Sequence, residues 1–377
     1  MAHNLDFSTG KAGLAFRGDR NDIWHRLGQE MQPGQSIDEW QEQAGLNWTA
    51  EKVAAFADLS LLDACQQAGT GLPAGMARAE NRHFIVRSDN GYILSPQTVS
   101  DRYTIVQPRE ALEFFEQYVS VDDRFAIDTA MCLKSGEIIA ATAVFNGDTT
   151  INGDLHRARL LMTTTYDGSG ATIAKATMTR VVCNNTLNAA IADGGKSVIS
   201  TRHNTKFNAE RVGKELANIA SGFAAYKAMG EAMAAKHFAD VDVSRFFKLT
   251  LDIDPAAKKE DISTRKFNQY EELFNCYHVG TRREGLEPRT AWSMLQGVTR
   301  YCDHNRSTSG SNGTPAGIAE SRFLSANFGS GAQMKAQAVA LLDEMSDGDL
   351  LRAVSQKTAD DADVSGILKQ AFRPSRG

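Results

Sequence analysis

Apolar and polar residues alternate over three consecutive stretches in the middle of the chain. These stretches are Arg124–Leu133, Ile138–Phe145 and His156–Thr165, and turn residues separate them. Alternation with a period of two is typical of strands that bury one face. The pattern therefore predicts an antiparallel β-meander, to which Ala171–Arg180 adds a fourth strand.

Shorter patterns before the meander predict one helix and three strands. Ser36 and Glu39 have the spacing of a capping box, and Trp40 and Ala44 follow on one face of the predicted helix. The rest of residues 1–60 looks irregular. His83–Arg87 and Gly91–Leu94 predict a hairpin around the turn at 88–91, and Tyr103–Gln107 predicts a short strand.

The remaining pattern is helical. Pro108 suits the first turn of a helix that covers Arg109–Tyr118. Apolar residues at a spacing of three to four predict a helix for Val181–Asp193, and the alanine-rich stretch Lys206–Phe238 predicts one long helix or two. Thr264–Thr308 looks mainly helical, and a last helix is expected at Ser330–Met345.

A β-rich half followed by an α-rich half indicates an α+β fold. It consists of a β-hairpin and an antiparallel meander flanked by helices, followed by a mainly helical C-terminal half. We expect an N-terminal arm with a short helix at 1–78 and an α+β core at 79–200. A mainly helical region at 201–350 and a flexible tail at 351–377 complete the division.

Composition narrows the class of protein. The 377 residues are 42% hydrophobic and 23% charged, which is typical of a folded globular chain. No apolar run approaches the roughly 20 residues of a membrane span, and no signal peptide is recognisable at the N-terminus. We therefore expect a cytoplasmic protein with no membrane partner. The formal net charge of −5 argues against a general polyanion binder but allows a local basic groove.

Motifs of the common enzyme and cofactor classes are missing from the sequence. No nucleotide-binding glycine motif or nucleophile elbow occurs, and Phe328–Lys335 lacks the ending that a phosphate-binding loop requires. Tyr301–His304 offers metal ligands without a second cluster to complete a site. The five cysteines are far apart, which argues against a disulfide framework or a zinc ribbon. We expect no metal and no cofactor.

One segment gathers basic side chains with few acidic ones. Arg157 and Arg159 alternate with Ala158 on a predicted strand, so they share one face, and Lys175 joins them from the next strand. Cations of this kind hold phosphates, an exposed tyrosine stacks on a base, and asparagines bond to the backbone. The candidate nucleic-acid-binding residues are Arg157, Arg159, Tyr166, Lys175, Arg180, Asn184, Asn185, Arg202, His203 and Lys206.

Ordinary structural roles also explain the same residues, and composition alone favours them for the basic side chains. The basic residues then form a solvated sheet face with common salt links. Asn184 and Asn185 then cap the helix predicted to follow them. Composition and spacing leave these alternatives open.

Several segments together resemble the phage/plasmid-like protein family, a bacterial domain of unknown function encoded by prophages and conjugative plasmids. The most informative is Arg180-Val-Val-Cys-Asn-Asn-Thr-Leu187. The other segments are Met1–Asp6, Trp24–Gly28, Ser36–Trp40, Ala44–Trp48, Tyr103–Pro108, Asp167–Ser169, Val298–His304 and Phe328–Lys335. The resemblance implies a mobile-element context and brings no activity with it.

A second resemblance concerns layout only. A helix, a β-meander and another helix over 109–193 are similar to the core of the single-strand annealing recombinases of the Rad-type and RecT superfamily. This likeness implies single-stranded DNA as the partner and a homo-oligomer, either ring or filament, with no nucleotide or metal. We therefore expect a DNA-metabolism protein that binds single-stranded DNA and anneals it.

Two other functions are compatible with the sequence. A protein-interaction or anti-defence factor would bind a host protein through Trp24, Trp40 and Trp48 or through the helical half. An uncharacterised enzyme would use Asp303 and His304 near Asp167.

Overall fold

The computed structural model has an α+β fold, as the sequence predicts. It describes residues 5–18, 27–58, 76–119, 125–145, 149–166, 172–180, 185–188, 198–200, 209–308, 318, 321–322, 325–327 and 329–353. The strands are β1 (Leu14–Phe16), β2 (Gln29–Glu30), β3 (Ala50–Asp58), β4 (Met76–Arg87), β5 (Val99–Ser100), β6 (Phe125–Leu133), β7 (Ile138–Phe145), β8 (Thr149–Ile151), β9 (Asp154–Thr165), β10 (Ile173–Arg180), β11 (Asn185–Asn188) and β12 (Val198–Ser200). The α-helices are α1 (Ile37–Gln43), α2 (Pro108–Val119), α3 (Ala209–Ala235), α4 (Asp240–Thr250), α5 (Thr264–Arg283), α6 (Ala291–Arg300) and α8 (Ser330–Glu344).

The main sheet contains the predicted meander. Within the described ranges its order is β11-β10-β9-β7-β6-β1-β2, with β8 paired to β9 and β12 paired to β10. The four strands β6, β7, β9 and β10 pair antiparallel with their neighbours along the chain. The alternating pattern predicted all four strands and their order.

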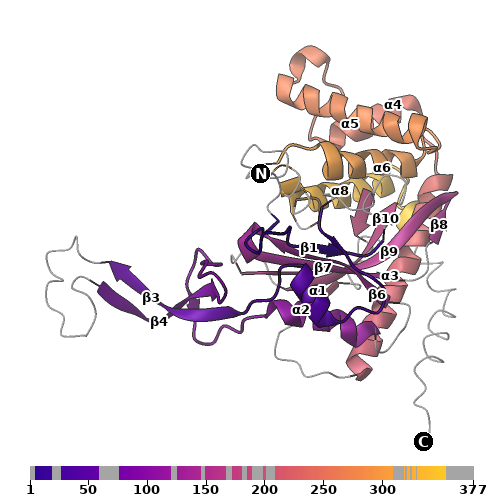
Figure 1. The fold of residues 1–377 in the computed structure, drawn as a ribbon. Helices are drawn as coiled ribbons and strands as arrows, with labels where there is room; N and C mark the ends of the chain where they lie inside the picture. The colour runs from indigo at the N-terminus through magenta and orange to yellow at the C-terminus, as the bar shows by residue number, and fades with distance from the viewer. Residues whose placement is uncertain are drawn as a thin grey trace, which may run out of the picture.

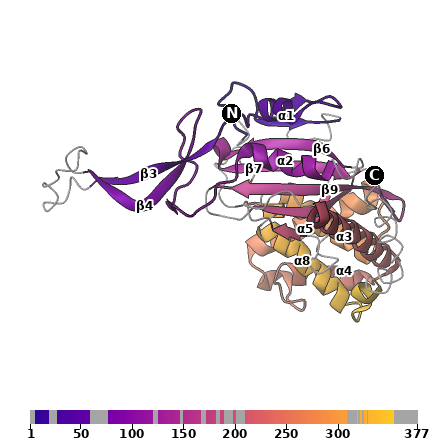
Figure 2. The same cartoon turned by 90° about the horizontal axis from the view of Figure 1, so that it is seen from below.

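Helices cover the sheet from both halves of the sequence (Figures 1 and 2). α2 packs on β6, β7 and β9, whereas α3 packs on β8 and β10, and α6 and α8 meet β11. α4, α5, α6 and α8 pack together into one helical group. One buried cluster runs through the molecule and contains Phe115 and Ile139 from the first half with Phe247, Trp292 and Leu342 from the second. No helix within the described ranges is long and apolar enough to cross a membrane.

A separate two-stranded ribbon projects from this body (Figures 1 and 2). β3 and β4 form it, with the short β5 beside β4. We call β3 and β4 together the arm. The arm is where the prediction of the N-terminal region is wrong, because residues 50–58 form a strand rather than irregular structure. Its β3 sequence is rich in alanine, which has a low preference for strands.

The predicted hairpin is present, because Arg87 N donates to Tyr92 O at 2.9 Å, Leu94 N donates to Ile85 O at 2.8 Å and Val86 forms an antiparallel bridge with Ile93. Two other local predictions are wrong. Tyr103–Gln107 forms no strand. Val181–Asp193 was expected to be a helix, yet Asn185–Asn188 forms β11. The edge of β10 supplies backbone partners for this segment, and strand pairing overrides its helix-like spacing.

Candidate nucleic-acid interface

The register of the meander places part of the predicted basic set on one sheet face. Arg157 and Arg159 of β9 lie opposite Thr179 and Thr177 of β10. Directly opposite residues lie on the same side of a sheet, and alternation along β10 then puts position 175 on that side too. The face that was predicted for Arg157, Arg159 and Lys175 therefore agrees with the backbone geometry. We call it the basic face.

Arg180 and Asn185 belong to the opposite face. Position 180 lies opposite His156, and position 185 lies opposite position 180. His156 is buried against the rings of Tyr226 and Trp292, so this is the face that the helices cover. The register therefore places position 180 on the other face of the sheet from Arg157. Asn184, Arg202, His203 and Lys206 lie outside the described residues.

Arg159 already has a partner on the basic face. Its Nε donates to Asp128 Oδ2 at 2.8 Å, and the side chains of Arg159 and Asp128 are 16% and 13% exposed. Thr142 Oγ1 also donates to Asp128 at 3.3 Å and bonds to Thr129 at 2.7 Å. Arg159 thus belongs to a half-buried polar network.

Tyr166 cannot stack on a base in this conformation. The residue is 2% exposed, and its hydroxyl donates to Val106 O at 2.6 Å. Its ring lies 6.1 Å from the ring of Trp48, centroid to centroid. Burial raises the pKa of the Tyr166 phenol well above its ordinary value. The predicted stacking role is wrong because the ring is part of the core.

The tryptophans proposed to bind a host protein are buried as well. Trp40 and Trp48 are 4% and 5% exposed, and Trp48 Nε1 donates to Gly45 O at 3.0 Å. Trp24 lies outside the described residues. Trp40 and Trp48 therefore stabilise the fold and offer no contact surface.

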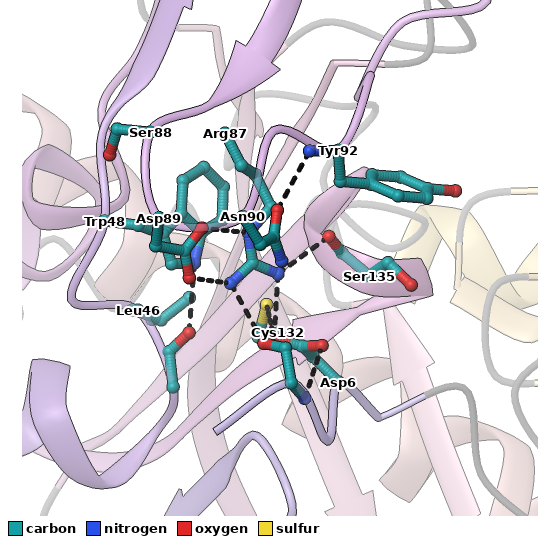
Figure 3. A network of polar contacts seen from close by, with 12 residues as sticks. Asp6, Leu46, Trp48, Arg87, Ser88, Asp89, Asn90, Tyr92, Cys132 and Ser135 are labelled. Atoms are coloured by element: carbon teal, nitrogen blue, oxygen red, sulfur yellow. Dashed lines mark hydrogen bonds and ion pairs between the residues drawn. The ribbon is translucent and has the colours of Figure 1, made fainter. Parts of the chain in front are cut away.

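A buried ionic network lies where the arm joins the sheet (Figure 3). Arg87, at the end of β4, donates to Asp6 Oδ2 at 2.8 Å, to Asp89 Oδ2 at 2.7 Å and to Ser135 O at 2.8 Å. Its guanidinium carbon lies 4.5 Å from the centroid of the Trp48 ring. The Arg87 side chain has no exposed surface and the Asp6 side chain is 5% exposed. We call this the arm-root network.

Close packing around the arm-root network requires a glycine. Gly136 lies in the turn between β6 and β7 with φ of +101°. A Cβ at this position would lie 2.8 Å from the Trp48 ring and 3.2 Å from Arg87 Cδ. Glycine both permits the left-handed backbone and leaves room for the guanidinium.

The electrostatics of the arm-root network indicate a structural rather than a catalytic role. Burial by itself would raise the pKa of Asp6, but hydrogen bonds from Ser8 and Arg87 outweigh it and hold that pKa below its ordinary value. Burial also raises the pKa of the Cys132 thiol, whose Sγ lies 3.8 Å from Asp6 Oδ2. A protonated thiol is a poor nucleophile. The network therefore holds elements together and lacks a reactive group.

A second buried ion pair joins two of the segments that resemble the phage/plasmid-like family, Val298–His304 and Phe328–Lys335. Asp303 lies in the π-helical turn Tyr301–Asn305, and Lys335 lies in α8. Lys335 Nζ donates to Asp303 Oδ1, and the two side chains are 2% and 9% exposed. Asp303, which the enzyme hypothesis would use, is thus held in a buried ion pair with Lys335. Asp167 lies outside the described residues. Among the residues that the structure describes, no group of three His, Cys, Asp or Glu could hold a metal ion.

The sequence reasoning missed the arm-root network. Asp6 and Trp48 both lie in segments that resemble the phage/plasmid-like family, and this was the one available signal. Their partner Arg87 lies 81 positions from Asp6, so spacing could not connect them.

Comparison with known proteins gives one significant result. No curated protein and no solved structure matches the chain. The family model for a domain of unknown function, DUF932, matches residues 97–344, from just before β5 to the end of α8. The match covers more than half of the chain, so the protein belongs to the DUF932 family.

Proposed function

We propose that this protein binds single-stranded DNA as a homo-oligomer and anneals complementary strands, in the DNA metabolism of a mobile element. The observation that carries the proposal is the order α2, meander, α3, with Arg157 and Arg159 on one face of the meander. This order is similar to the layout of single-strand annealing recombinases. The helix that completes the order is α3 rather than one at 181–193.

Charge on the basic face supports binding to a phosphate backbone. Arg157 and Arg159 are neighbours on the same side of β9, and β10 adds position 175. Annealing needs neutralised phosphates and accessible bases but no metal or nucleotide. The overall charge of −5 restricts such binding to a local surface.

Fluorescence anisotropy with a labelled oligodeoxythymidine tests the proposal directly. We expect binding at low salt and a linear loss of log affinity with log salt concentration, because each phosphate contact releases a counterion. Absence of binding at low salt, or binding with no salt slope, contradicts the proposal. A second assay with two complementary oligonucleotides should show faster annealing in the presence of the protein.

Arg157→Ala is the most informative variant. It should weaken binding for every base sequence and lower the salt slope by about 0.7 if Arg157 contacts one phosphate. Arg245→Ala, an exposed arginine of α4, removes the same charge far from the sheet and is the matched control. Equal slopes for the two variants would contradict a role for the basic face.

A second candidate function is a protein-interaction or anti-defence factor. The observation that favours it is the arm, which projects from the body and exposes the apolar side chains of Val53 and Phe56, 46% and 41% accessible. Such a protein would leave oligonucleotides unbound at every salt concentration.

A further inference from the structure

We propose that the outer edge of β3 pairs with β3 of a second copy of this chain, antiparallel, about a two-fold axis at Ala55. The proposal rests on the homo-oligomer of the proposed function and names the surface that would form it. It also concerns a segment that lies before the residues matched by the family model.

β3 is an open edge. It pairs with β4 on one side, and no described strand lies on its other side. Natural edge strands are usually short or protected by a bulge, a proline or several charges. β3 runs for nine residues without proline. The register between β3 and β4 shifts between Ala54 and Phe56, and the extra residues of this irregularity lie in β4. Beyond Ala50 the arm also stands clear of the body, and no other described element covers this edge (Figures 1 and 2).

Backbone hydrogen bonds show which residues of β3 face outward. Thr49 O accepts from Ser88 N at 2.9 Å, so position 49 faces β4. At Ala50 the side-chain amide of Gln107 accepts from the backbone N–H at 2.9 Å and donates to the backbone O at 3.0 Å. Gln107 therefore acts as a strand substitute at the first outward position. By alternation, Lys52 and Ala54 present the next outward groups, followed by positions 56 and 58.

Side chains limit the register of a second copy. The outward backbone N–H and C=O groups of two β3 strands can bond to each other only when even-numbered positions lie opposite one another. An axis at Ala54 would place Asp58 against Ala50, whose backbone groups Gln107 already occupies. An axis at Ala55 instead places Phe56 over Ala54 twice and Lys52 opposite Asp58 twice, where Lys52 Nζ would exchange its 2.6 Å hydrogen bond to Asp101 O for the carboxylate. Opposite charges and a large side chain over a small one both stabilise directly opposed pairs.

Pairing of two arms also explains why the arm exposes apolar side chains. An isolated two-stranded ribbon is only marginally stable in water. Val53 and Phe56 are large apolar residues that are 46% and 41% exposed. Pairing of two arms would form a four-stranded sheet from β4, β3 and their counterparts, which shields both side chains. A phosphate backbone offers no such apolar contact, so the edge suits protein better than DNA.

Charge reversal tests the register. Lys52→Asp places two carboxylates opposite each other in each pair, and Asp58→Lys places two ammonium groups there. We expect each single variant to weaken association about tenfold or more, and the double variant Lys52→Asp/Asp58→Lys to restore it. Sedimentation velocity of the full chain over a concentration series measures the dissociation constant.

An edge-blocking variant provides the second test. Ala54→Pro removes an outward N–H and leaves the hydrogen bonds to β4 in place, so it should abolish association. Circular dichroism and melting temperature show whether each variant is folded. A wild-type chain that stays monomeric overturns the proposal and leaves the edge to a partner of another kind. Unchanged association in the single variants, or no rescue in the double variant, overturns it too.

Oligonucleotide titrations of the same samples separate this proposal from the proposed function. DNA binding by a monomeric wild type overturns β3 pairing and the homo-oligomer but leaves single-stranded DNA binding supported. Association through β3 without DNA binding overturns the proposed function alone.

Discussion

Arg87 joins three segments that are distant in the sequence. Its guanidinium binds Asp6 from the N-terminal segment, Asp89 from the turn after β4 and Ser135 from the turn after β6. A charge without exposed surface is stable only when its partners satisfy it. The arm therefore leaves the body at a fixed point, because its last residue is held from three directions.

Replacing Arg87 should destabilise the whole protein. Arg87→Ala leaves the Asp6 carboxylate buried without its cation, and such a change costs about 3–5 kcal/mol of unfolding free energy. Urea denaturation followed by tryptophan fluorescence measures the loss. Arg352→Ala is the control, because Arg352 and Asp349 are 67% and 62% exposed and such pairs contribute at most about 1 kcal/mol. Similar losses in the two variants would contradict the structural role of the arm-root network.

The burial and contacts of individual side chains were the hardest features of this molecule to predict from the sequence. Tyr166 precedes a glycine-rich turn, where a tyrosine can be either exposed or buried. Its burial depends on Trp48 and on the carbonyl of Val106, which is 60 positions away. Contacts of this range leave no periodic signal in one sequence. Arg157 and Arg159 were predictable as neighbours on one face because alternation along a single strand is local.

At the level of elements, local signals succeeded where they specify the backbone directly. In α1, Ser36 N donates to Glu39 Oε2 at 2.7 Å, and Glu39 N donates to Ser36 Oγ at 3.3 Å. This capping box was predicted from two residues at the right spacing. β11 shows the opposite case, because its neighbour β10 decides its conformation. β3 gave no strand signal, since its stability comes from pairing with β4 rather than from its alanine-rich sequence.

The capping box gives a prediction for helix stability. Ser36→Ala should lower the unfolding free energy by about 1 kcal/mol, because it removes the acceptor for Glu39 N and a donor to the Glu39 carboxylate. Ser263→Ala in α5 should cost less, since Ser263 Oγ accepts a single 3.4 Å hydrogen bond from Lys266 N. Chemical denaturation of both variants measures the order, and a larger loss for Ser263→Ala would contradict it.

For the whole molecule, the α+β class followed from the order of strand-like and helix-like patterns. The domain boundary predicted near residue 200 does not follow from those patterns in the same way. Tyr226 of α3 and Trp292 of α6 pack against His156 of β9, with ring centroids 5.5–6.0 Å apart. The buried cluster thus passes from the sheet into the helical half. Sequence patterns identify elements but not the side chains that join them, so the predicted division needs a test of cooperativity.

A single substitution at this junction supplies the test. Gly230 of α3 packs so closely that a Cβ would lie 2.8 Å from Ile151 of β8 and 3.3 Å from Trp292. Gly230→Val should therefore destabilise the protein by about 1–3 kcal/mol through overpacking. Because one core joins the two halves, we expect a single unfolding transition that moves as a unit in calorimetry, circular dichroism and fluorescence.

The matched control lies on the exposed side of the same helix. Lys227→Val introduces the same side chain at a position that is 49% exposed, and its effect should stay within about 0.5 kcal/mol. Two separate transitions, of which only one shifts in Gly230→Val, would show that residues 201–350 unfold independently and that the core is not one cooperative unit. Coincident shifts would instead place the boundary predicted near residue 200 inside a single folding unit. The same steric conflict would then destabilise the strands and the helices together.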